Sequence, residues 1–222
     1  MQSVEISGEL ALAAPGLQLS CIECDVIVEL KNEALWKKIV LKINELNALL
    51  KVEDISQLPA ISASRIAYKS CGKDPARYRL SAEALLRRVV NRSELYQVNN
   101  VVDALNLVSI STGFSIGGYD VSKIKGTAVF GIGKKDEAYE GIGRGELNIE
   151  SMPVFRDELG AFGTPTSDSV RTSVSAETHR FLMIIIDYGP SDSLTGATEM
   201  AKELLTEFAD ATNFEIKLVK IQ

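Results

Sequence analysis

The side chains best suited to chemistry lie in one short segment, Asn99-Asn100-Val101-Val102-Asp103-Ala104-Leu105-Asn106. If the segment is helical, Asn99, Asp103 and Asn106 fall within about 60° of one another around the helix axis. The remaining positions are apolar apart from Asn100, which is typical of a buried helix. Buried carboxylate and amide groups are costly unless they are paired. The polar stripe therefore either fixes neighbouring backbone or faces a polar ligand, with Asn100 beside it.

Two glycines and a tyrosine follow this segment, in Gly117-Gly118-Tyr119-Asp120. Glycine allows the backbone to approach a ligand closely. We therefore expect Gly117, Gly118 and Tyr119 to line the same pocket as the asparagines.

A basic stretch precedes the asparagine-rich segment. Residues 65–92 contain eight Lys or Arg residues and only two acidic ones, on a chain whose net charge is -6. Clustered basic side chains are what phosphate binding requires. Arg77, Arg79, Arg87 and Arg88 are therefore candidates for RNA contact, and the alternative is that they form ion pairs within the fold.

The helices and strands that must position these groups are predicted from the spacing of apolar residues and from capping and turn residues. Helical spacing and capping residues predict helices that begin at Asn32, Ser81 and Asn99, the last ended by Gly113. A further helix is expected through residues 194–208, and strands over residues 4–12, 17–30, 181–187 and 214–219. The glycines between residues 131 and 145 are typical of hairpin turns. These elements predict an α+β fold with a mixed sheet.

Bulk properties exclude several classes of protein. The chain has 222 residues, of which 45% are hydrophobic and 24% charged, as in ordinary globular proteins. Its apolar runs are too short to span a membrane, and its start lacks the features of a secretory signal, so we expect a cytoplasmic protein with no membrane partner. Cys21 and Cys24 are expected on opposite faces of a strand, and no histidine lies nearby, so we expect no metal site and no cofactor. The acidic balance argues against a DNA partner.

The segment also carries a resemblance to a known family. Asn-Asn-Val-Val-Asp-x-x-Asn, then Gly113, then Gly-Tyr-Asp-x-x-Lys-x-x-Gly ending at Gly126, is similar to the B3/B4 domain of the bacterial phenylalanyl-tRNA synthetase beta chain. The block Lys73-Asp74-Pro75-Ala76-Arg77-Tyr78-Arg79-Leu80-Ser81-Ala82-Glu83-Ala84-Leu85-Leu86-Arg87-Arg88 ahead of it resembles freestanding B3/B4-domain proteins still more closely. The resemblance covers roughly residues 65–126.

The resemblance implies a fold and a function. It implies a single B3/B4-type domain over residues 1–222, with a mixed sheet or partly open barrel-like core packed by helices. In the synthetase this domain is an editing hydrolase that removes tyrosine wrongly attached to the phenylalanine tRNA. Asn106 matches the family's pocket asparagine, whereas Gly117 stands where the synthetase carries a histidine, so that side chain's role as a base or water holder is lost.

Two hypotheses follow for function. The first is a domain that interacts with tRNA or aminoacyl-tRNA, extending to hydrolysis of mischarged aminoacyl-tRNA. The second is a non-catalytic module that binds a small amino-acid-like molecule in a retained pocket. A complete aminoacyl-tRNA synthetase is excluded, because nothing in the chain resembles an ATP-binding core.

Overall fold

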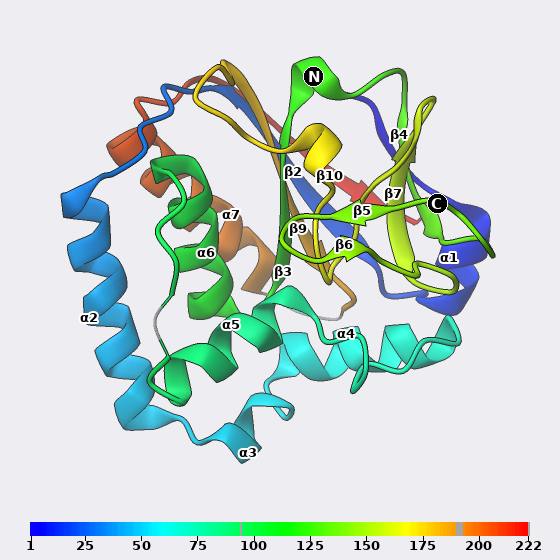
Figure 1. Ribbon diagram of the computed structural model, residues 1–222, viewed down its shortest axis with the longest axis horizontal. Helices are drawn as coiled ribbons and strands as arrows, with labels where there is room; N and C mark the ends of the chain where they lie inside the picture. The colour runs from blue at the N-terminus through cyan, green and yellow to red at the C-terminus, as the bar shows by residue number, and fades with distance from the viewer. Residues whose placement is uncertain (94, 190–192, 222) are drawn as a thin grey trace.

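Three layers make up the fold: helices, a first sheet and a second sheet (Figure 1). The computed structural model describes residues 1–93, 95–189 and 193–221. The first sheet has the order β10-β2-β9-β3 and the second β1-β4-β7-β8. The architecture is mixed α and β, as predicted, and the two sheets remain separate rather than closing into a barrel.

The helices are short to medium in length and lie mostly on one face of the first sheet. Their bounds are α1 Gly8–Ala13, α2 Glu33–Leu49, α3 Val52–Ile55, α4 Pro59–Ser70, α5 Ser81–Val90, α6 Asn100–Thr112 and α7 Ser193–Ala209. Figure 1 shows α2, α5, α6 and α7 grouped on the same side of that sheet. Within the described residues, none of these helices combines the length and the apolar character that crossing a membrane would require.

The strands of the first sheet are all antiparallel: β2 Gln18–Asp25, β3 Ser115–Asp120, β9 Arg180–Asp187 and β10 Thr212–Lys220. The second sheet is mixed, because β1 Val4–Ile6 runs parallel to β4 Ala128–Ile132, while β7 Pro153–Asp157 and β8 Gly160–Gly163 are antiparallel. A small hairpin, β5 Glu140–Gly141 with β6 Gly145–Glu146, stands beyond it. This hairpin confirms the turn predicted from the later glycines, where Gly143 and Gly145 have positive φ, whereas Gly131 lies within β4.

The central strand β9 explains where the core lies. Its side chains alternate between the helical layer (Phe181, Met183 and Ile185) and the second sheet (Leu182, Ile184 and Ile186). All six are buried, and each contributes about 1.5–3 kcal/mol by leaving water. The unbroken apolar run over residues 181–186 therefore forms a strand that is buried on both faces.

Cysteine placement follows the same alternation in β2. Cys21 packs between the two sheets and Cys24 packs against the helices, so the two thiols point to opposite faces as predicted. Both are free and buried, and burial raises the pKa of each to about 12. They are core residues in this fold.

Three predicted elements have wrong bounds, and the first is the strand expected over residues 17–30, which ends at Asp25. The expected strand over residues 4–12 ends at Ile6, because the Ser7 hydroxyl accepts a hydrogen bond from the Leu10 N–H at 3.2 Å and caps α1. Ser81 is the first residue of α5 rather than its cap, and its N–H donates to the Pro165 carbonyl. By contrast, Asn32 does cap α2, and Gly113 ends α6 in the left-handed region.

Candidate functional site

Asn99 and Asn100 hold the start of α6 in place. The Asn99 side chain accepts from the Val102 N–H at 2.9 Å and caps the helix. Asn100 donates from Nδ2 to the carbonyls of Ile27 and Phe208, and its Oδ1 accepts from the Glu29 N–H. Both side chains are buried. Of the two roles open to them, fixing neighbouring backbone is the one that these contacts describe.

Asp103 is held by its own surroundings in the same way. Its carboxylate accepts from Trp36 Nε1 at 2.9 Å and from the Val98 N–H at 3.0 Å. Burial raises the pKa of this carboxyl, while these two hydrogen bonds act in the opposite direction. Asp103 and the half-buried Asn106 line a hollow of only about 10 Å³, which is too small for more than one water molecule.

Trp36 also lines a larger groove on its outer side. This groove of about 820 Å³ lies between α2 and residues 92–93 and 95–97, and Val40, Ile43 and Tyr96 line it too. The polar stripe does not line it, since Asp103 and Asn106 face the small hollow behind Trp36.

Gly117 and Gly118 on β3 are required by close packing within the protein. A Cβ at Gly117 would overlap the hydroxyl of Tyr119, and a Cβ at Gly118 would lie 2.7 Å from Leu105 Cδ1. The buried Tyr119 phenol therefore occupies the space that a side chain at position 117 would need. A histidine at this position is incompatible with the observed Tyr119.

The partner of Tyr119 is a residue that sequence reasoning missed, Asp168. Its Oδ1 accepts from the Tyr119 hydroxyl at 2.9 Å and its Oδ2 from the Gly118 N–H at 3.3 Å. Burial raises the pKa of Asp168 to about 7, and the two hydrogen bonds offset only part of this shift. Asp168 lies in the Ser/Thr-rich segment 164–169, where nothing in the spacing marks it as a partner of β3.

The basic stretch is divided between structure and surface. The buried Glu83 accepts from Arg65 at 2.8 Å and from Arg87 at 3.0 Å, while Arg79 lies 3.7 Å away. Arg77 and Arg79 are exposed on the loop before α5. Arg88 lies over the Tyr96 ring, 4.5 Å from its centroid. One carboxylate thus meets several guanidinium groups, and the surface here keeps an excess of positive charge.

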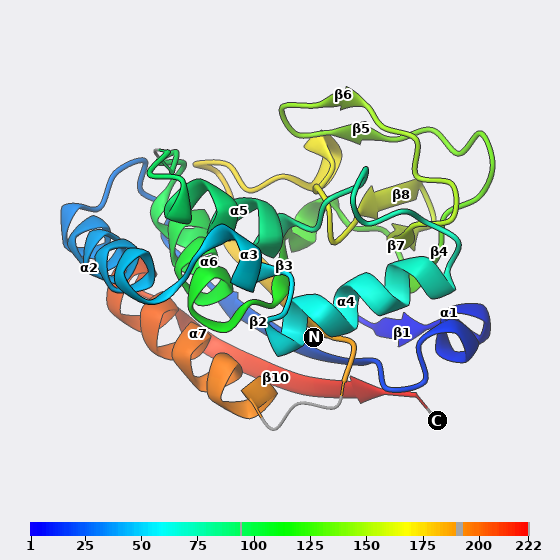
Figure 2. The ribbon, with the colours of Figure 1, turned by 90° about the horizontal axis from the view of Figure 1, so that it is seen from below.

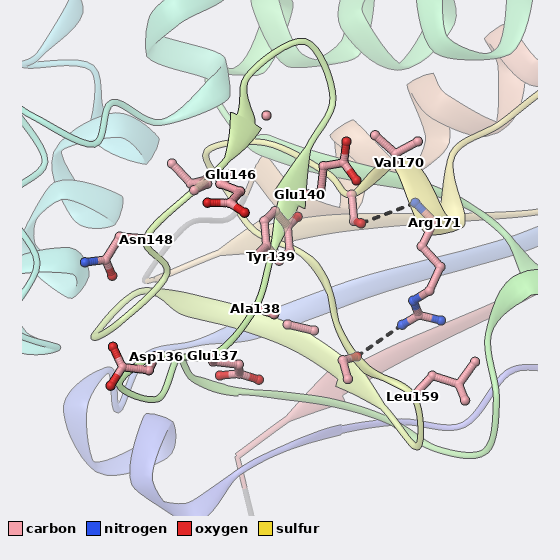
Figure 3. A pocket seen from close by; sticks show the side chains of 15 residues that line it. Asp136, Glu137, Ala138, Tyr139, Glu140, Glu146, Asn148, Leu159, Val170 and Arg171 are labelled. Atoms are coloured by element: carbon pink, nitrogen blue, oxygen red, sulfur yellow. Dashed lines mark hydrogen bonds between the residues drawn. The ribbon is translucent and has the colours of Figure 1, made fainter.

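A large cavity lies at the β5–β6 hairpin (Figure 3). Its volume is about 1280 Å³, ample for a small organic ligand. Its walls come from residues 136–140, 145–148, 159–161 and 169–171. Ser169, which lines this wall, directly follows Asp168 in the chain. The Asp168 carbonyl accepts a hydrogen bond from the Ile142 N–H in the hairpin.

Acidic side chains dominate the cavity. Glu140 and Glu146 are register partners across the hairpin, and both line the cavity with Tyr139 (Figure 3). Asp136 and Glu137 also line the cavity, and Glu137 is paired with Arg156 at 2.8 Å. Arg171 is the basic side chain in the wall, and Asp157 holds its guanidinium at 2.8 Å.

The basic loop, residues 71–80 between α4 and α5, adjoins this acidic cavity. Lys73 Nζ donates to the carbonyls of Asn148 and Glu150 at 3.0 and 2.6 Å, and Asn148 lines the cavity. Lys73 also lies over the ring of Tyr78, the residue that directly precedes the exposed Arg79. Lys73 therefore fixes this loop to a residue of the cavity wall.

Metal binding has no support in the part of the chain that the structure covers. Among the described residues, no group of three or more His, Cys, Asp or Glu side chains converges as metal ligands would.

Comparison with known proteins places the chain in a family. The model of the B3/4 domain matches residues 63–205, well over half of the chain. The protein belongs to the B3/4 domain family. The predicted resemblance is thereby confirmed, and the matched range contains α6, Gly117, Asp168 and the cavity.

Structural comparison agrees with this assignment of the fold. An N-terminal fragment of the phenylalanyl-tRNA synthetase beta-subunit from Pyrococcus horikoshii has a TM-score of 0.50 and 15% sequence identity. The similarity covers 96% of this B3/4 protein and 50% of that fragment, so the chain spans about half its length. No match was found among curated protein sequences.

Proposed function

We propose that this B3/4 protein binds the aminoacylated end of a tRNA, with the aminoacyl group in the β5–β6 cavity and the phosphates against the basic loop. Membership of a family related to a tRNA synthetase subunit supports an RNA partner. The observation that carries the proposal is the contact of Lys73 with Asn148, which joins the basic loop to the wall of the acidic cavity.

The acidic wall suits the charge of an aminoacyl group. An aminoacyl ester carries a protonated α-amino group, which is a small organic cation. Like charges directly opposite each other on paired strands are destabilising, so Glu140 and Glu146 favour a cation between them. The ammonium group of the ligand supplies this cation.

The basic loop suits the nucleic acid. Arg77 and Arg79 are exposed, and Lys73 anchors the loop to the cavity rim through Asn148. Phosphate contacts from such side chains give binding that weakens as salt rises. A phosphodiester chain that crosses this loop would bring its terminal ester to the cavity mouth.

The same arrangement supports hydrolysis of a mischarged ester. Water attacks the ester carbonyl carbon, the bond to the ribose oxygen breaks, and the proton passes to that oxygen, which releases the amino acid and free tRNA. Such an ester is already activated, so oriented water is the main requirement. Glu140 and Glu146 are the carboxylates placed to hold that water, whereas Gly117 has no side chain for this role.

A non-catalytic, amino-acid-binding role is the second candidate. It is favoured by the composition of the cavity wall, whose described residues include no histidine and no cysteine. In this alternative the cavity binds a free amino acid or a similar small amine, and the basic loop plays no part.

The test combines binding and turnover on one set of variants. Gel shifts with aminoacyl-tRNA at rising salt should show binding that Arg77→Ala/Arg79→Ala weakens at least tenfold. The control Lys202→Ala/Lys220→Ala removes the same charge from α7 and β10 and should leave binding unchanged. Release of amino acid from mischarged tRNA, lost in Glu140→Gln/Glu146→Gln, would establish hydrolysis. Binding of a free amino acid without any tRNA shift would overturn the proposal in favour of the second candidate.

A further inference from the structure

Among the described residues, no strand pairs with the outer edge of β10 in the first sheet. β10 is the terminal strand in the order β10-β2-β9-β3, and it follows the lower border of the molecule in Figure 2. Its regular ladder with β2 runs from Glu215 to Lys220, after an irregularity that follows Thr212. The outward N–H and C=O groups of such a strand are a template for another strand.

This edge also carries exposed apolar side chains. Ile216 and Leu218 are 44% and 48% exposed. They point to the same face of the sheet, since they are two residues apart. Exposed apolar groups on an open strand edge are typical of a pairing surface.

We propose that this edge pairs with β10 of a second copy of the chain, antiparallel and centred on Ile216. A two-fold axis between antiparallel strands is perpendicular to the sheet, so each side chain must lie opposite one that points to the same face. Only registers centred on a residue meet this condition. Centring on Glu215 or Lys217 puts like charges opposite each other, and centring on Leu218 sets Ile216 against Lys220.

The register centred on Ile216 gives complementary pairs instead. Ile216 meets its own copy, and Glu215 lies opposite Lys217 of the second copy in both halves of the pair. Opposite charges in directly opposed positions are stabilising, by roughly 0.2–1 kcal/mol for each pair. The chain is thus self-complementary in this register.

The surroundings of Glu215 favour an added cation. Arg180 is in contact with three carboxylates, those of Glu23, Asp25 and Glu215. The amino group of Met1 lies 2.9 Å from Glu215 and is the second positive charge in this cluster. One negative charge remains in excess, and Lys217 of the second copy would balance it.

The charges also explain why pairing would be selective. Charged side chains and bulges on an edge strand normally prevent indiscriminate pairing. Here Glu215 or Lys217 would face a like charge in registers centred on either residue, whereas each faces an opposite charge in the register centred on Ile216. The dimer leaves the cavity open, because β5 and β6 lie on the side of the molecule opposite β10 (Figure 2).

The first test measures the mass of the full chain in solution. Sedimentation over a concentration series should show a monomer–dimer equilibrium for the wild type. Lys217→Glu places acidic side chains opposite Glu215 and should weaken the dimer at least tenfold. The control Lys220→Glu makes the same change in net charge at a position opposite Thr212 and should have a much smaller effect. A wild-type protein that stays monomeric at all concentrations, or two variants with equal effects, would overturn the proposal.

The second test fixes the register without changing charge. Ile216→Cys places thiols on the two-fold axis, so mild oxidation should link two chains rapidly. Leu218→Cys is the matched control, since position 218 lies opposite Phe214 and cannot meet its own copy. Equal cross-linking of both variants, or faster linking of Leu218→Cys, would refute the register. Melting curves of all variants establish that each is folded.

Discussion

The buried Asp168 makes a sharp prediction about the pH dependence of stability. Its pKa of about 7 in the folded protein lies well above the usual value of 3.8. The cause is burial, which penalises the charged form more than the Tyr119 hydroxyl and the Gly118 N–H compensate. Replacing Asp168 by Asn removes the titration and keeps the shape.

The sign and size of the effect of Asp168 on the free energy of unfolding follow from the protons bound in the folded and unfolded states. Below pH 4 the carboxyl is protonated in both states and carries no penalty. Between pH 4 and 7 the unfolded chain loses its proton while the folded chain keeps it, so this group's contribution to stability falls as pH rises. Three pKa units at about 1.4 kcal/mol each amount to about 4 kcal/mol, lost in full above pH 7.

The assay is urea unfolding of the wild type and of Asp168→Asn at intervals from pH 4 to 8. Asn can accept from Gly118 and donate to the Tyr119 oxygen, so it resembles the protonated acid. We expect the variant to gain stability relative to the wild type by up to about 4 kcal/mol as pH rises. Subtracting the two curves of unfolding free energy against pH removes the contribution of the other carboxyls, which both proteins share. A difference that is constant with pH, or a variant that becomes relatively less stable above pH 7, would refute the reasoning.

Three further predictions concern packing around α6 and β3. Gly117→Ala should lower the free energy of unfolding by roughly 1–3 kcal/mol, but cost little in a Tyr119→Ala background, since that ring is what the new methyl group meets. Trp36→Phe removes a donor to the buried Asp103 and should cost roughly 1–3 kcal/mol, more at pH 7 than at pH 4 in chemical unfolding. Asn100→Ala leaves the carbonyls of two segments without their donor and should cost more than about 2 kcal/mol, with faster amide exchange at residues 27–29. An unchanged melting temperature in any of these single variants would contradict its assigned contact.

Local signals in the sequence predicted the elements around α6 well. Asn99 and Gly113 mark both ends of the helix, and the apolar run of β9 is a strand buried on both faces. These features depend on residues close together in the chain. The α+β class and the family follow from the same local patterns, because the B3/4 motifs are ordered along the sequence.

Contacts between distant segments could not be predicted in this way. Asp168 lies about fifty positions from Tyr119, and no periodic pattern links them. The acidic cavity depends on a short hairpin whose strand pairing sets Glu140 opposite Glu146. Ser7 caps α1 within a segment whose apolar residues also fit a strand, so the wrong element was expected there. Short-range propensity is a weak guide where one polar contact decides the outcome.

The position of Tyr119 changes how the family's missing histidine is understood. If Gly117 were only a lost catalytic group, restoring histidine would be the natural way to restore a base. In this structure the Tyr119 phenol fills that space and donates to Asp168, which also accepts from the Gly118 N–H. A histidine at position 117 would therefore require Tyr119 to move. Under the proposed function, water for hydrolysis is held by groups on the cavity wall, and for this reason Glu140 and Glu146 are the residues to change first.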